Sequence, residues 1–153
     1  MKPILFSLLS IFFLACKTVH VPVTVGTNTL NSYIIRSDVK LSEENNYFYF
    51  TNETDFRNIF TLTKSLPGNI VIPDFNVQRV ISIALKPTTH LIDIKFLKST
   101  TQNDDLNVYY EKTVTVGSTF LHTPFCVATL TKIESVKRIH FYNGGKREKT
   151  IDL

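Results

Sequence analysis

The stretch "HLIDIKFLKSTTQNDDLNVYYEKTVTV", residues 90–116, decides the fold that we expect for this 153-residue chain. Apolar and polar side chains alternate in both halves, which is the period of a β-strand with one buried face. Asn, Asp and Asp at 103–105 are residues that favour a turn. The stretch therefore predicts an antiparallel hairpin. The side chains expected to face the core are Ile92, Ile94, Phe96, Leu106, Val108 and Tyr110.

Further strands are expected on both sides of this hairpin. The run from 79 to 85 is almost wholly apolar, as in a central strand covered on both faces. The other segments with strand character are 32–37, 45–52, 123–136 and 137–145. In the segment 137–145 we expect Ile139 and Phe141 to face the core and Arg138, His140 and Tyr142 to face outward. Asn143-Gly144-Gly145 is expected to form a turn at its end.

One segment has helical character, "TNETDFRNIFTLTKSLPG" at residues 51–68. Thr51 or Asn52 suits the N-cap, and an acidic residue follows about three positions later. Pro67-Gly68 is expected to end the helix. The side chains that share one face at helical spacing are Phe56, Ile59, Phe60 and Thr63.

These elements predict an α+β fold, with an antiparallel-rich sheet or partial barrel of about six strands and one main helix packed on it. We expect a single globular α+β domain over residues 32–153. Residues 16–31 are polar and are expected to form a tether or a loose first strand.

Residues 1–15 have the pattern of a signal peptide. Lys2 precedes an apolar run that starts at Ile4 and ends at small Ala15. The run is shorter than the roughly 20 apolar residues that span a membrane, so it does not predict a lasting transmembrane helix.

Phe13-Leu14-Ala15-Cys16 resembles a bacterial lipobox, in which the cysteine thiol carries lipid. The resemblance implies cleavage before Cys16, acylation with palmitate or a similar chain, and a bilayer as the first partner. Two or more acyl chains hold a protein stably on a membrane. Lys17 stands where an aspartate would signal inner-membrane retention. We therefore expect a lipoprotein of the bacterial cell envelope, on the outer membrane and facing the periplasm. Ordinary secretion is the alternative.

Charge and motif content argue against several function classes. A net charge of +4 on 153 residues is too small for a nucleic-acid footprint. The basic cluster at 146–149 is interrupted by Glu148 and predicts a solvated tail or turn. The four histidines lack metal-ligand spacing, and no nucleotide-binding or hydrolase motif occurs. Cys126 lies in an apolar run and predicts a small buried hydrophobe. We expect no metal, no cofactor and no enzyme activity.

Two segments have the composition of recognition loops. The first comprises Lys86, Pro87, Thr88, Thr89 and His90, and the second runs from 117 to 124 and includes Phe120 and His122. Each offers hydroxyl groups, a proline and a histidine, and Phe120 and Leu121 add apolar surface. The alternative is that both segments are plain connectors, with Phe120 folded into the core.

The stretch from Asn46 to about Phe141 resembles the C-terminal domain of PrcB-like proteins. The motifs that carry the resemblance are Thr54-Asp55-Phe56, Asp74-Phe75, Pro87-Thr88 and Thr123-Pro124-Phe125. That family stabilises a secreted bacterial protease complex, which implies a protein partner of the protease class. The family has Pro-Thr-Gly-Gly-Tyr where this chain has Pro87-Thr88-Thr89-His90-Leu91. The same segment resembles part of the Pro-Thr-Thr-Gly loop of chagasin-like cysteine-protease inhibitors.

These observations predict a membrane-anchored, non-enzymatic lipoprotein that binds or stabilises a protein partner through residues 86–90 and 117–124. The alternatives are a protease inhibitor that inserts residues 86–90 into an active-site cleft, a structural envelope lipoprotein, and a small-molecule binder.

Overall fold

The computed structural model describes residues 21–63 and 70–153, which form eleven strands and one helix. The signal segment, Cys16 and the expected helix end at Pro67-Gly68 lie outside the described residues. The elements are β1 (Val23–Val25), β2 (Thr27–Thr29), β3 (Tyr33–Ile35), β4 (Asn45–Phe50), α1 (Glu53–Ile59), β5 (Phe60–Leu62), β6 (Gln78–Leu85), β7 (Thr88–Gln102), β8 (Asp105–His122), β9 (Phe125–Thr131), β10 (Arg138–Asn143) and β11 (Lys146–Asp152).

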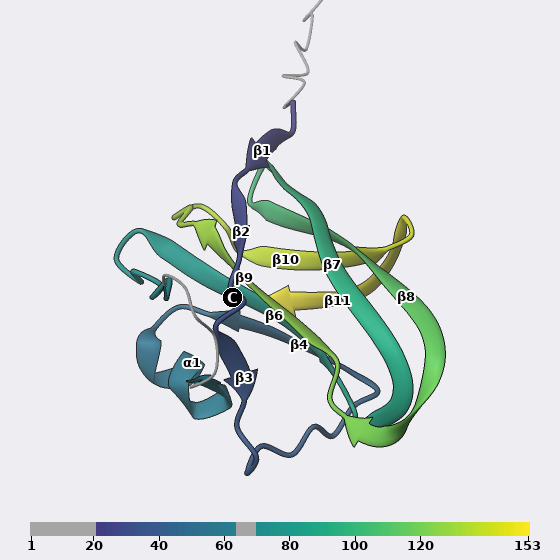
Figure 1. The fold of residues 1–153 in the computed structure, drawn as a ribbon. Coiled ribbons are helices and arrows are strands. Elements are labelled where there is room, and N and C mark those ends of the chain that lie inside the picture. Colours follow the sequence, from purple (N-terminus) through teal and green to yellow (C-terminus); the bar gives the residue numbers. More distant parts are fainter. Residues whose placement is uncertain (1–20, 64–69) are drawn as a thin grey trace, which may run out of the picture.

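The strands form three open sheets (Figure 1). The five-stranded sheet has the order β1-β7-β8-β10-β11, the four-stranded sheet has the order β2-β9-β6-β4, and β3 pairs with β5. Every pairing is antiparallel except that of β8 with β10. The chain is therefore mostly β, and about six strands in one sheet or partial barrel describes it only loosely.

The main core lies between the two larger sheets. Alternate side chains of β6, including Ile81 and Ile83, pack against Val108 and Tyr110 of β8. Ile139 and Phe141 of β10 complete this layer, as the alternation predicted. His140, expected to face outward, is nevertheless buried, because Thr150 of β11 and Asp105 of β8 cover its ring.

A second core fills the opposite face of the four-stranded sheet. Val80 of β6 and Val127 of β9 contact aromatic side chains from α1 and the small sheet, including Phe56 and Phe60. The strand β6 is therefore covered on both faces, and residues 80–85 are all buried. This confirms the prediction of a central strand at 79–85.

The helix α1 begins as predicted and ends early. The Asn52 side chain caps it by accepting a hydrogen bond from the Asp55 backbone N–H at 2.9 Å. The helix stops at Ile59, and Phe60 starts β5, so the predicted helical face through Phe60 and Thr63 is wrong. The backbone of Phe60 is extended because it pairs with Ile35 of β3, and its ring is buried there. This tertiary pairing outweighs the local helical period.

Strands also lie at the two ends of the described chain. β1 and β2 lie inside residues 16–31, where a tether or a loose first strand was expected, and they pair with β7 and β9. β11 occupies the basic cluster that predicted a solvated tail or turn, and that prediction is wrong for the backbone. Its side chains are mostly exposed because β11 is an edge strand. The preceding turn has positive φ at Gly144 and Gly145, as expected for a two-residue hairpin.

Candidate functional site

The two segments predicted for partner binding lie side by side. Thr88 at the start of β7 is the register partner of His122 at the end of β8, and His90 faces Gly117. We call residues 86–91 and 117–122 the ribbon tip, because they form the open end of the long β7–β8 ribbon at the bottom of Figure 1. Lys86 and Pro87 are exposed just before β7.

The ribbon tip differs from the expected pair of loops. Residues 88–90 and 117–122 lie within strands rather than in the expected loops. The reason is that each segment supplies the other with a backbone hydrogen-bonding edge. The register pairs Thr88 with His122 and His90 with Gly117 enclose four residues on β8 against one on β7, so β8 bulges at 118–121. Irregularities in register at 88–90 and 90–92 show that the pairing bends here, and the His90 N–H donates to the Thr88 hydroxyl at 3.1 Å.

Large apolar side chains are exposed at the ribbon tip. Phe120 is 78% exposed and Leu121 is 69% exposed, while Leu91 on the other strand is also open to solvent. Both residues lie in the β8 bulge at 118–121, so the ribbon tip presents two adjacent, mostly exposed apolar side chains. The alternative of a Phe120 ring folded into the core is therefore wrong.

The ribbon tip extends beyond the body of its sheet. Among the described strands, β10 pairs with β8 only over residues 105–110, and β1 pairs with β7 only over 99–101. Among the strands that the structure describes, the segments 88–98 and 111–122 therefore pair only with each other. Ile92, Ile94 and Phe96 of this ribbon pack on the main core, so the most exposed part of the ribbon is its tip.

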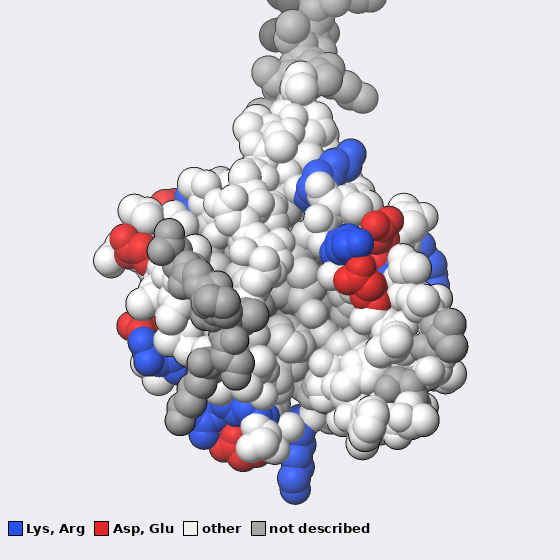
Figure 2. All heavy atoms as spheres, in the orientation of Figure 1, with Lys and Arg blue, Asp and Glu red and all other residues white. Residues whose placement is uncertain are grey.

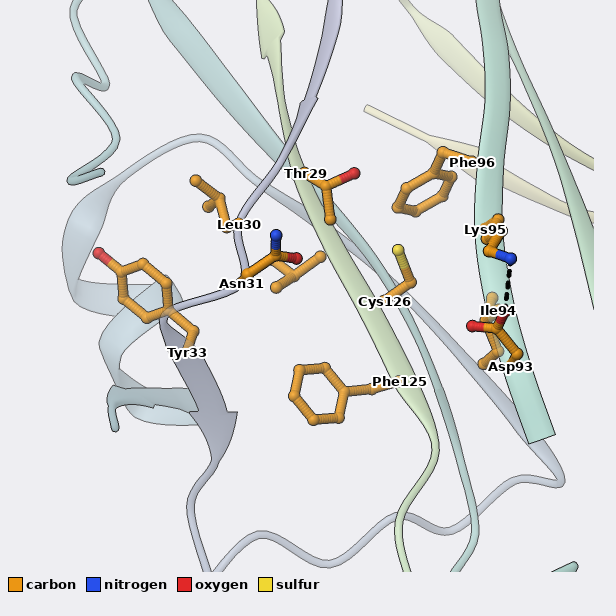
Figure 3. A pocket seen from close by; sticks show the side chains of 11 residues that line it. Thr29, Leu30, Asn31, Tyr33, Asp93, Ile94, Lys95, Phe96, Phe125 and Cys126 are labelled. Atoms are coloured by element: carbon orange, nitrogen blue, oxygen red, sulfur yellow. Dashed lines mark ion pairs between the residues drawn. The ribbon is translucent and has the colours of Figure 1, made fainter. Parts of the chain in front are cut away.

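A cavity that the sequence did not indicate lies next to this ribbon. It has a volume of about 550 Å³ and opens between the β7 edge at 93–96 and the β9 edge at 125–127 (Figure 3). Burial raises the pKa of the Cys126 thiol, and the nearby main chain of Phe96 partly offsets this rise in pKa. Cys126 is thus the small buried hydrophobe that its surroundings predicted. No sequence signal marks this cavity, because its position depends on the point at which the chain after β2 turns away from the edge of β9.

The described residues contain no group of three or more His, Cys, Asp or Glu side chains arranged to hold a metal ion. Over the same residues no helix is long and apolar enough to cross a membrane. The ribbon tip carries threonine hydroxyls, two imidazoles and exposed apolar side chains.

Comparison with protein families, with curated proteins and with solved structures found no match to this chain.

Proposed function

We propose that this chain is a lipid-anchored, non-enzymatic module of the bacterial cell envelope that binds a protein partner through the ribbon tip. Acylated Cys16 would hold it on the outer membrane, facing the periplasm. The observation that supports partner binding is the pairing of Thr88 with His122, because it joins the two recognition segments into one surface. The resemblance to PrcB-like domains suggests an exported protease complex as the partner.

The affinity of such a surface comes mainly from its apolar side chains. Phe120 and Leu121 are mostly exposed, and burying side chains of this size gains about 1.5–3 kcal/mol each. Interfaces concentrate their binding energy in a few anchors of this kind. The hydroxyls of Thr88 and Thr89 then supply orientation rather than most of the free energy.

The inhibitor alternative requires residues 86–90 to enter an active-site cleft as a projecting loop. Thr88 and His90 are instead paired with β8, which favours docking of a whole ribbon over insertion of one loop. Nanomolar inhibition of a secreted protease that disappears on replacing Thr88 and Thr89 would favour the inhibitor. The structural-lipoprotein alternative predicts that no partner depends on the tip.

Capture from envelope extract tests the proposal. The soluble form starting at residue 17 is compared with the double variant Phe120→Ser/Leu121→Ser and with the control Val77→Ser. Val77 is 59% exposed and precedes β6 at the end opposite Leu85, whose N–H donates to Pro124 beside the tip. We expect a protein that is retained by the wild type and the control and is reduced about tenfold or more by the double variant, which corresponds to about 1.4 kcal/mol. Equal retention by all three would contradict the proposal.

A further inference from the structure

The N-terminal strands show that an extended chain fits between the edges of the two larger sheets. β1 pairs with β7 at residues 99–101, and β2 pairs with β9 at residues 128–130. The segment from Val23 to Thr29 thus runs from one sheet edge to the other, and Figure 1 shows it descending along both. The molecule therefore already uses this gap to hold a strand.

The N-terminal chain occupies only part of the gap between β7 and β9. The Leu30 N–H donates to the Val127 carbonyl at 2.8 Å, and residues 31–32 then turn away toward β3. Beyond this point the cavity of about 550 Å³ continues between β7 and β9. We call this cavity the slot, bounded by residues 93–96 of β7, 125–127 of β9 and the departing residues 29–31.

Main-chain groups of both walls point into the slot. Residues 92–96 of β7 pair in regular register with β8 on one edge of the strand. Main-chain direction alternates along a strand, so the N–H and C=O groups of every second residue of 93–96 point to the other edge, which bounds the slot. On β9, Val127 directs its carbonyl to Leu30, and the same alternation directs the Phe125 main chain into the slot.

The walls of the slot favour an uncharged occupant. Ile94 and Cys126 are buried apolar side chains of the walls. Lys95 and Asp93 neutralise each other through an ion pair of 2.7 Å on the rim (Figure 3). Figure 2 shows an uncharged hollow down the middle of this face, with charged side chains along its right-hand rim. Backbone pairing with side-chain pockets is how extended peptides join a sheet.

We propose that the slot binds an extended, uncharged segment of a partner polypeptide as an added strand that continues the path of β1 and β2. This inference rests on the proposed function, since it names the form in which a protein partner is held. Asp93 lies five residues along β7 from Thr88, about 16 Å at 3.3 Å per residue. A partner that contacts the ribbon tip therefore reaches the slot with a short extension.

A displayed library of random heptapeptides, selected on the full chain in detergent, tests the inference. Enriched peptides are then synthesised with and without N-methyl groups at alternate residues, because N-methylation removes the backbone donors that strand addition needs. The groove-filling variant is Asn31→Trp, and the control is Asn28→Trp, an exposed β2 residue outside the slot. Alkylation of Cys126 by iodoacetamide, measured at that residue by mass spectrometry, reports occupancy.

We expect enriched peptides to bind the wild type and Asn28→Trp, and to bind Asn31→Trp at least tenfold more weakly. N-methylation should weaken binding by a similar factor, and bound peptide should slow Cys126 alkylation at least tenfold. The inference is overturned by a selection without enrichment, or by peptides that are insensitive to N-methylation and leave Cys126 alkylation unchanged. These two readouts do not depend on the folding of Asn31→Trp.

The outcomes separate this inference from the proposed function. If capture of the partner depends on Phe120 and Leu121 and the peptide selection yields no enrichment, strand addition in the slot is contradicted and binding at the ribbon tip is supported. If peptides occupy the slot and capture of the partner is the same for the tip variants, binding in the slot is supported and binding at the ribbon tip is contradicted.

Discussion

The hydroxyl groups of Tyr47 and Tyr110 lie 2.8 Å apart, and their hydrogen bond joins β4 of the four-stranded sheet to β8 of the five-stranded sheet. The two partners differ in exposure, because Tyr110 is 1% exposed while Tyr47 is only partly buried. The bond therefore crosses the main core between the sheets and has one end near solvent.

This asymmetry predicts unequal effects of the two Tyr→Phe variants. Tyr47→Phe leaves the deeply buried Tyr110 hydroxyl without its partner, which should lower the free energy of unfolding by about 1–3 kcal/mol. Tyr110→Phe leaves the Tyr47 hydroxyl within reach of water and should cost about 1 kcal/mol or less. Urea unfolding of both single variants and of the double variant measures the three values.

The double variant Tyr47→Phe/Tyr110→Phe serves as the control for this pair. Removing both hydroxyls leaves no orphaned polar group, so its stability should be close to that of Tyr110→Phe alone. Strictly additive losses would show that the two hydroxyl groups do not depend on each other.

The same tyrosines predict a loss of stability at alkaline pH. Burial raises the pKa of Tyr110 and the pKa of Tyr47 above their ordinary value of 10.0. The folded protein thus holds these protons more tightly than the unfolded chain. Their stabilisation is complete below pH 10 and is lost as the pH rises above it. Urea unfolding between pH 8 and 11 should show this fall, and the double Phe variant should show a smaller one. Identical slopes for the two proteins would argue against this assignment.

The β10–β11 turn predicts a contrast among glycines. Gly144 and Gly145 have φ values of 56° and 83°, where a side chain strains the backbone. Replacing either by Ala should cost about 1–2 kcal/mol of unfolding free energy. Gly26, between β1 and β2, has no such φ and has open space where the methyl group of an alanine would lie, so Gly26→Ala should change stability by less than about 0.5 kcal/mol. Thermal unfolding of the three variants compares them, and equal losses at Gly26 and Gly144 would refute the explanation.

The parts of the fold that depend on local pattern could be predicted from the sequence. The β7–β8 hairpin, the central strand β6 and the Asn52 cap each leave a signal within a few residues, as alternation, an apolar run or a capping side chain. Local patterns failed where a distant partner decides the structure. Phe60 fits a helix by spacing and becomes a strand because Ile35 pairs with it.

In the candidate site, too, local sequence signals predicted some features, while contacts between distant segments decided others. Thr88, His90, Phe120 and His122 stood out by residue type, and their proximity follows from the length of the β7–β8 ribbon. Their strand conformation could not be predicted, because threonine, proline and histidine equally suit a loop. The slot had no signal, since its walls come from strands β7 and β9, which lie about 30 positions apart in the sequence and are set apart by the exit of the chain at Leu30.

The lipid anchor predicts a simple fractionation result. Cys16→Ser should abolish labelling by radioactive palmitate and move the protein from the membrane to the soluble fraction, because a single substitution removes all acyl attachment. Cys126→Ala is the control, since Cys126 is the second cysteine of the chain and is buried. It should keep both the label and the membrane location. Unlabelled wild-type protein that retains Met1 would contradict the anchor.

Photo-crosslinking in living cells tests partner binding at the ribbon tip most directly. A photoreactive amino acid is placed at position 120 in one variant and at position 77 in the other, both mostly exposed positions at opposite ends of the fold. We predict that illumination joins the position-120 variant to one discrete envelope protein and leaves the position-77 variant uncrosslinked. The same pattern of products from both positions, or none from position 120, would contradict the account.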